Sequence, residues 1–374
     1  MLPLPPLSLY IHIPWCVQKC PYCDFNSHAL KQEVPEADYV AALLADLSHD
    51  LHYVQGRQLQ SIFIGGGTPS LFSAAAIKTL LDGVAAQIPF ADDIEITMEA
   101  NPGTVEAGRF IGYQRAGVTR ISIGVQSFQP EKLQRLGRIH DPAQAIAAGL
   151  QAKQAGLRSF NIDLMHGLPE QSVSDALSDL QQAIEIAPPH LSWYQLTIEP
   201  NTAFGSRPPV LPEDETLWDI QEQGHQLLLA AGYRQYEISA YAKPGFECRH
   251  NPNYWQFGDY LGIGCGAHGK ITMPAENRII RTAKVKHPKG YLDPERAFLD
   301  QSWDVEDEDR PFEYFMNRMR LFQPIPKAEF TARTNLPAES VEAMFKRAYE
   351  QELLEQSETE WKVTELGHRY LNSL

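Results

Sequence analysis

Short apolar runs alternate with longer amphipathic stretches along the first 200 residues. Runs rich in β-branched and aromatic residues have the length of strands, at residues 7–13, 61–65, 95–100, 120–125, 159–165 and 191–198. The stretches between them often begin near Ser, Thr, Asp or Pro and end near Gly or Pro, as helices do, at residues 36–54, 73–87, 104–116, 142–155 and 172–187. Such alternation predicts parallel strands joined by crossover helices. Six β/α units predict an α/β protein with a partial barrel, short of the usual eight units.

The pattern loosens after about residue 200. A Pro-rich segment, NTAFGSRPPVLP, and a helix near residues 213–231 precede the glycine-rich CRHNPNYWQFGDYLGIGCGAHG, which we interpret as a specialised loop region at a site. An acidic link at residues 304–311 leads to a tail with two helices, a short hairpin around LLEQSETEWKV and a last helix. We therefore expect two domains, residues 1–300 and a mainly helical domain of winged-helix proportions at residues 304–374.

Composition and charge narrow the class of protein. The chain has 374 residues, of which 43% are hydrophobic, and 47 acidic residues outnumber 32 basic ones to give a net charge of -15. This balance argues against a surface for nucleic acid, so the winged-helix proportions indicate packing against the barrel or a partner. The N-terminus lacks a basic segment before its apolar residues, and no apolar run reaches about 18 residues. We expect a cytoplasmic protein without a transmembrane segment, and peripheral contact with a membrane stays open.

Three of the five cysteines fall within eight residues, directly after the first predicted strand. Cys16, Cys20 and Cys23 form a CxxxCxxC motif, which suits metal binding better than a disulfide framework. Three thiolates leave one iron of a [4Fe–4S] cluster without a protein ligand, and S-adenosylmethionine (SAM) can chelate that iron. The alternative is a tetrahedral zinc site completed by His12 or His28, although no second pair of cysteines accompanies the motif.

Polar residues lie at or just past the end of each of the six predicted strands. They are Cys16, the segment Gly65-Gly66-Gly67-Thr68, Glu99 with Asn101, Gln126, Asp163 and Glu199. One such residue would be a turn former or a helix cap, but six successive strands end in this way. Because the chemistry of β/α barrels lies at the carboxyl ends of the strands, we expect these residues to form a site.

The motif strings resemble a known superfamily and one family within it. The CxxxCxxC spacing, the aromatic Tyr22 and GGGTP are similar to the radical SAM superfamily, and YIHIPWC, FIGGGTPS, GVQSF, NIDLMHGLP and HNPNYW resemble the HemW family of heme chaperones. That family is related to oxygen-independent coproporphyrinogen III oxidase. The resemblance covers nearly the whole chain and implies a partial (β/α)6 radical SAM barrel with a shared C-terminal domain.

The resemblance also implies roles for individual residues. It places Tyr10 near a cluster-bound SAM and assigns the amino acid end of SAM to Gly66, Gly67 and Thr68, since glycines let the backbone approach a ligand. The rest of SAM would contact Glu99, Gln126, Arg138 and Asp163. Without the resemblance, Arg138 would be interpreted as a solvated arginine at a helix end.

Two functions from different classes remain. One is an oxidase that decarboxylates coproporphyrinogen III through a 5′-deoxyadenosyl radical, and the other is a carrier that binds heme and delivers it to client hemoproteins. The oxidase family has a longer leader than the 15 residues before Cys16, and Phe25 stands where its CxxxCxxCxC motif has a cysteine. We therefore predict a heme chaperone that keeps a [4Fe–4S] cluster and SAM, and whether it is also an enzyme stays open.

The string HNPNYW is the candidate heme motif. It resembles the HNxxYW motif of heme-chaperone members and implies that His250 binds the heme iron, since imidazole is a common axial ligand. Taken alone, His250 before Pro252 would be interpreted as part of a turn, and Tyr254 and Trp255 as anchors of a loop in the core. Cys248 is an alternative ligand. The expected partners are heme and client hemoproteins, among them membrane-bound respiratory enzymes, and a homodimer stays open.

Overall fold

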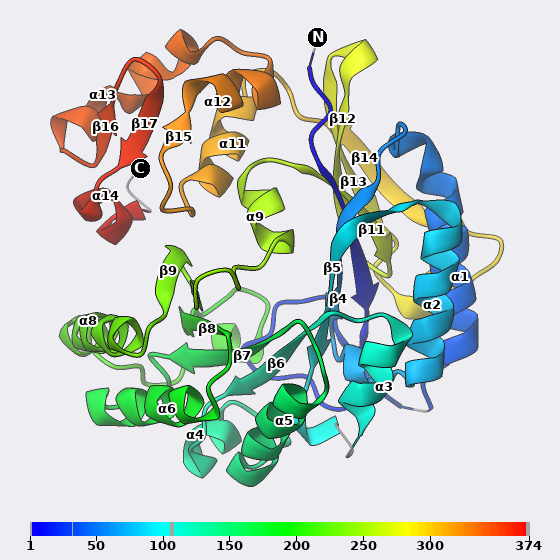
Figure 1. The fold of residues 1–374 in the computed structure, drawn as a ribbon, viewed down its shortest axis with the longest axis vertical. Coiled ribbons are helices and arrows are strands. Elements are labelled where there is room, and N and C mark those ends of the chain that lie inside the picture. Colours follow the sequence, from blue (N-terminus) through cyan, green and yellow to red (C-terminus); the bar gives the residue numbers. More distant parts are fainter. Residues whose placement is uncertain (1, 32, 105–107, 372–374) are drawn as a thin grey trace.

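The structure, a computed structural model, describes residues 2–31, 33–104 and 108–371. Within these ranges, twelve strands form one sheet in the order β14-β13-β12-β11-β1-β4-β5-β6-β7-β8-β10-β9. Seven central strands are parallel, namely β11 (Asp259–Gly264), β1 (Leu7–Ile13), β4 (Leu59–Gly66), β5 (Phe90–Ala100), β6 (Arg120–Gln126), β7 (Ser159–His166) and β8 (His190–Gln195). The sheet curves but does not close, because β14 and β9 remain as its two edges (Figure 1).

The six predicted strands and the helices between them are confirmed. The strands follow one another across the sheet, and the longer helices that connect them are α1 (Glu36–Asp50), α2 (Ala74–Gln87), α3 (Arg109–Ala116), α5 (Pro142–Gln154) and α6 (Val173–Ile186). Shorter elements are η1 (Leu51–Tyr53), η2 (Pro69–Leu71), η3 (Pro102–Thr104) and α4 (Pro130–Arg135). The Ser73 side chain caps α2, and capping boxes at Asp141 and Ser172 begin α5 and α6. The helix expected at 104–116 begins at Arg109, and residues 105–107 lie outside the described part.

The strands have one apolar face and one polar face. In β1, Leu7, Leu9 and Ile11 alternate with Ser8 and with polar residues that line a cavity, because successive side chains point to opposite sides of a strand. The apolar face packs under the helices that cover the outside of the sheet (Figure 1). The inner, concave face is therefore polar, and it is the face on which a site can form.

The segments after residue 200 extend the sheet at both edges. Strands β9 (Arg234–Glu237) and β10 (Ala240–Ala242) continue it antiparallel beyond β8, and β12 (His268–Met273), β13 (Arg278–Lys284) and β14 (Leu299–Asp304) continue it beyond β11. The helices of this region are α7 (Ala203–Ser206), α8 (Asp214–Ala230), α9 (His250–Trp255) and α10 (Pro288–Tyr291), with η4 at Pro274–Glu276. The expectation of a loop for HNPNYW is wrong, since these six residues form α9. The following DYLGIG is a seventh parallel strand beside β1.

The C-terminal tail has its own aromatic core. It contains α11 (Arg310–Arg318), β15 (Ile325–Pro326), α12 (Lys327–Thr334), η5 (Ala338–Val341), α13 (Glu342–Glu350), β16 (Leu354–Gln356), β17 (Glu360–Val363) and α14 (Glu365–Arg369). The rings of Phe315, Phe330, Phe345 and Trp361 contact one another. Phe257, which follows α9, belongs to the same core, so the tail packs against the segment that carries the candidate heme motif (Figure 1). Among the described helices, none is long and apolar enough to cross a membrane.

Candidate functional site

The three cysteines of the motif line one cavity at the carboxyl end of β1. The chain leaves β1 at Ile13 and forms the short strand β2 (Trp15–Cys16), which pairs with β3 (His28–Ala29). Cys16 ends β2, and Cys20 and Cys23 lie in the turn that follows. All three thiols line a cavity of about 250 Å³. Within the described ranges, no group of three or more His, Cys, Asp or Glu side chains is placed so that it could hold one metal ion.

The glycine segment holds the cysteine loop in place. The N–H groups of Gly67 and Thr68 donate to the carbonyl oxygens of Ile13 and Trp15, both at 2.7 Å. A Cβ atom on Gly67 would lie 2.4 Å from the Trp15 oxygen, so the close approach requires glycine. The N–H of Gly66 donates to Glu99 Oε2 at 3.0 Å. Because these three N–H groups are occupied, they are not available to a ligand.

Two carboxyl groups, those of Glu99 and Asp163, line this cavity. Burial, with a further contribution from the charge of Asp163, raises the pKa of Glu99 to about 8, and the hydrogen bond from Gly66 opposes this shift. Burial also raises the pKa of Asp163, although this carboxylate accepts hydrogen bonds from Asn161 Nδ2 at 2.7 Å and Ser122 Oγ at 3.0 Å. A positively charged ligand would stabilise the ionised forms of both groups. The pair therefore suits the ammonium and sulfonium charges of SAM.

Arg138 lies in the cavity rather than in solvent at a helix end. Its Nη2 donates to the Gly124 carbonyl at 2.5 Å, and its Nη1 lies 3.6 Å from Cys20 Sγ. Its Nε is buried and has no hydrogen-bond partner among the described residues. A guanidinium at this place can balance the negative charge that thiolate ligands bring to a cluster. The contact of Arg138 with SAM stays a prediction.

Gln126 lines the same cavity and contacts Tyr194, a residue that was not predicted from the sequence. The side chain of Gln126 accepts a hydrogen bond from the Tyr194 hydroxyl at 2.9 Å. Tyr194 lies in β8 and lines the same cavity, but the sequence of this strand gives no signal that separates Tyr194 from an aromatic residue of the core. Thus the cavity brings together the three cysteines, Gly66, Gly67, Thr68, Glu99, Gln126, Arg138 and Asp163.

A larger cavity of about 910 Å³ adjoins the first. Both are lined by Lys19, Phe25, Ser27, Gly66 and Glu99. The larger one is also lined by aromatic side chains from β1, β4, α9 and β11, namely Tyr10, Phe63, Tyr254, Trp255 and Tyr260. Its size is in the range of pockets for small molecules and cofactors. Tyr10, expected near SAM, lies in this larger cavity and contacts His12 Nδ1 through its hydroxyl at 2.8 Å.

His250 also lines the larger cavity, but both of its ring nitrogens are occupied. It is 1% exposed at the start of α9. Its Nδ1 contacts Ser61 Oγ at 2.8 Å, and its Nε2 is hydrogen-bonded to the Tyr254 hydroxyl. Burial, with a further contribution from the charge of Arg120, lowers the pKa of His250 to about 3, so the imidazole is neutral. An iron atom can bind Nε2 only after the Tyr254 hydroxyl moves away.

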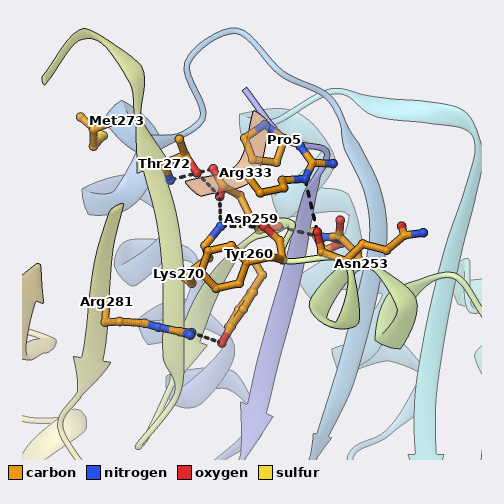
Figure 2. A network of polar contacts seen from close by, with 12 residues as sticks. Pro5, Asn253, Asp259, Tyr260, Lys270, Thr272, Met273, Arg281 and Arg333 are labelled. Atoms are coloured by element: carbon orange, nitrogen blue, oxygen red, sulfur yellow. Dashed lines mark hydrogen bonds and ion pairs between the residues drawn. The ribbon is translucent and has the colours of Figure 1, made fainter. Parts of the chain in front are cut away.

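The asparagine of HNPNYW fixes the end of α9 to the sheet. Asn253 Nδ2 donates to the Asp259 carbonyl at 2.9 Å and to Ser8 Oγ at 3.0 Å. The Asp259 carboxylate is in turn bound by Thr272 Oγ1 at 2.8 Å and by Lys270 Nζ at 3.1 Å (Figure 2). Burial lowers the pKa of Lys270 to about 8, and Asp259 opposes that shift. This network gives the asparagine a structural role, separate from ligand binding.

The remaining histidines and cysteines of interest lie outside the cluster cavity. His12 Nε2 contacts the Asn26 carbonyl at 2.8 Å, and both His12 and His28 line the larger cavity, away from the wall that carries the three thiols. Cys248 is buried and accepts a hydrogen bond from the Tyr236 hydroxyl at 3.1 Å. Cys265 donates to the Lys286 carbonyl at 2.9 Å. Neither cysteine lines the described part of either cavity.

Comparison with known proteins places this geometry in a family. The model of the radical SAM superfamily matches residues 10–180, and that of the HemN C-terminal domain matches residues 305–370. The chain is 65% identical to the heme chaperone HemW of Escherichia coli, over 100% of this chain and 98% of that protein. It is 61% identical to the heme chaperone HemW of Haemophilus influenzae, over 99% and 97% of the two chains.

A solved structure shows the same fold. The coproporphyrinogen III oxidase HemN of Escherichia coli, described as a radical SAM enzyme, has a TM-score of 0.82 and 23% identity, covering 98% of this chain and 89% of that one. At this identity the likeness extends to the fold alone. The cysteine loop and the glycine segment line one cavity, and close relatives match the chain over its full length. The chain therefore belongs to the HemW family of radical SAM proteins.

Proposed function

We propose that the protein binds heme in the larger cavity and delivers it to client hemoproteins, with a [4Fe–4S] cluster and SAM in the smaller cavity. The observation that carries the proposal is the contact between the two cavities. The larger one is lined with aromatic rings and includes residues of HNPNYW, and it opens beside the three cysteines. The names of the relatives from Escherichia coli and Haemophilus influenzae support the same function.

The residues of the smaller cavity fit the cluster and SAM. Cys16, Cys20 and Cys23 would hold three irons, and a reduced cluster supplies an electron to SAM. Arg138, 3.6 Å from the Cys20 sulfur, balances the charge of the thiolates. Glu99 and Asp163 would face the positive charges of SAM, and because the N–H groups of Gly66 and Gly67 are occupied, their carbonyl groups would accept from its ammonium group.

The residues of the larger cavity fit a planar apolar ligand. Trp255 and Tyr254 provide aromatic surface, and the neutral imidazole of His250 is the candidate iron ligand once Tyr254 has turned away. Client hemoproteins, among them membrane-bound respiratory enzymes, are the proposed acceptors. The cytoplasmic location, the peripheral membrane contact and the homodimer stay predictions from the sequence.

A heme titration tests the proposal. The anaerobically reconstituted wild type and His250→Ala are titrated with heme, following the Soret band and the cluster absorbance. The matched control is His225→Ala, since His225 lines a groove of about 950 Å³ between α8 and α14, away from the cysteines. We expect saturable binding that is weakened in His250→Ala alone, with the cluster retained. Weak binding unaffected by either variant, together with conversion of coproporphyrinogen III to protoporphyrinogen, would favour the oxidase instead.

A further inference from the structure

We propose that Lys19 and Lys286 form a carboxylate-recognition site at one end of the larger cavity, which binds the two propionate groups of a tetrapyrrole. The inference rests on the proposed heme binding, and it names the residues that distinguish a tetrapyrrole with free carboxylates from one without them. Both lysines line the cavity, and they come from distant parts of the chain, the cysteine loop and the segment after β13.

The cavity has an aromatic end and a basic end. At the aromatic end, the ring of Tyr254 in α9 lies 4.4 Å from that of Tyr260, near the beginning of β11. At the basic end, Gly266, which follows β11, donates its N–H to the Val285 carbonyl at 2.9 Å, and Lys286 comes next in the chain. The two ends are separated by the length of β11 from Tyr260 to Gly264, about 13 Å at the usual rise of a strand. A macrocycle with its carboxylates on one edge matches this polarity.

The backbone of Lys286 is fixed between the cysteine loop and the end of β11. Its carbonyl accepts hydrogen bonds from Asn26 Nδ2 at 2.8 Å and from Cys265 Sγ at 2.9 Å. Its side chain is exposed and forms no ion pair within the described ranges. Burial lowers the pKa of His268, and the positive charge of Lys286 lowers it further, which indicates that this charge lies close to the cavity wall.

Lys19 brings a second positive charge from the cysteine loop. Its Nζ contacts the Phe25 carbonyl at 3.4 Å, a weak interaction that a carboxylate can replace, and no ion pair joins it to another described residue. The carboxyl groups that line this cavity are those of Asp24 and Glu99. Glu99 also lines the smaller cavity, where the positive charges of SAM would balance its carboxyl group, so Asp24 is the carboxyl group left to oppose the two lysines. The basic end is thus positive in a chain with a net charge of -15.

The inference predicts a preference for heme over heme dimethyl ester. Partly exposed ion pairs contribute modestly to the free energy of binding. Two of them predict that the wild type binds heme with a Kd about 3- to 20-fold lower than that for the ester. The double variant Lys19→Gln/Lys286→Gln removes both charges and retains side chains of similar length. The control is Lys153→Gln/Lys362→Gln, which removes two exposed lysines outside the cavity lining.

The experiment is an equilibrium titration of each reconstituted protein with heme and with heme dimethyl ester. We expect the Lys19/Lys286 variant to bind the ester as the wild type does and to lose the preference for heme, while the control keeps it. An unchanged preference in the Lys19/Lys286 variant would overturn the inference and leave the proposed function standing. A wild type that binds neither ligand would overturn the proposed function, and the inference with it.

Discussion

Replacing Tyr254 with Phe tests how His250 becomes available to iron. In the structure, the Tyr254 hydroxyl is hydrogen-bonded to His250 Nε2, while Nδ1 contacts Ser61. The substitution removes only the hydroxyl. It keeps a ring that packs 4.7 Å from the imidazole and 4.4 Å from Tyr260. If His250 is the axial ligand, the wild type must break this hydrogen bond before heme binds, and Tyr254→Phe does not.

The expected change follows from the value of one hydrogen bond. A buried intramolecular hydrogen bond contributes about 0.5–1.5 kcal/mol net, and each 1.4 kcal/mol is about tenfold in an equilibrium constant. Tyr254→Phe should therefore lower the Kd for heme by about 2- to 13-fold. The hydroxyl stabilises the heme-free state through its hydrogen bond to Nε2. Its loss should therefore raise the free energy of the heme-free state relative to the bound state, which also lowers the Kd.

The assay is a Soret titration combined with electron paramagnetic resonance of the ferric heme. Tyr260→Phe serves as the control, because its hydroxyl accepts from Arg281 Nη1 at 2.9 Å and has no contact with His250. We expect tighter binding with an unchanged ferric signal in Tyr254→Phe, and no change in Tyr260→Phe. Weaker binding and an altered ferric signal in Tyr254→Phe, with little effect of His250→Ala, would refute the reasoning and identify the phenol oxygen as the ligand.

Three further predictions concern the smaller cavity. Cys20→Ser should abolish the SAM-responsive signal of the reduced [4Fe–4S] cluster in electron paramagnetic resonance, and persistence of that signal would contradict the ligand assignment. Gly67→Ala would place a methyl group 2.4 Å from the Trp15 oxygen, so iron and sulfide content should fall after reconstitution. Gly56→Ala strains a backbone with a φ of 75° but has no atom within 4 Å of the new methyl group and lies away from the cysteines, so it should keep both. Between about pH 4.5 and 8 the folded, cluster-free protein keeps the Glu99 proton that the unfolded chain releases, because the folded pKa is raised to about 8. Its free energy of unfolding should therefore fall as pH rises, by at most about 1.4 kcal/mol per pH unit from this group. In Glu99→Gln that part of the slope, measured by chemical denaturation, should disappear.

The sequence allowed the prediction of the parallel part of the fold because its signals are local. Each of the six strands is a compact apolar run bounded by turn residues, and each crossover helix carries caps that involve nearby residues, as at Asp141 and Ser172. Strand β11 was not predicted because its glycines interrupt the apolar pattern. Helix α9 was not predicted because a six-residue helix with proline at its third position resembles a turn in sequence.

The candidate site was predictable in its residues but not in its contacts. The polar residues at the strand ends and the resemblance together gave most of the residues that line the smaller cavity, Arg138 included, whereas Glu199 lines neither cavity. The occupied N–H groups of the glycine segment and the contact of His250 with Ser61, 189 positions away in the chain, depend on how distant segments pack. The division into two adjoining cavities, with Tyr10 in the larger one, has the same origin.

Anomalous diffraction at the iron edge, from crystals of the heme-loaded and cluster-containing protein, tests the central claim most directly. We expect iron density beside Cys16, Cys20 and Cys23, and a separate heme iron in the larger cavity near α9. A heme iron in the groove between α8 and α14, or at any place away from the larger cavity, would contradict it.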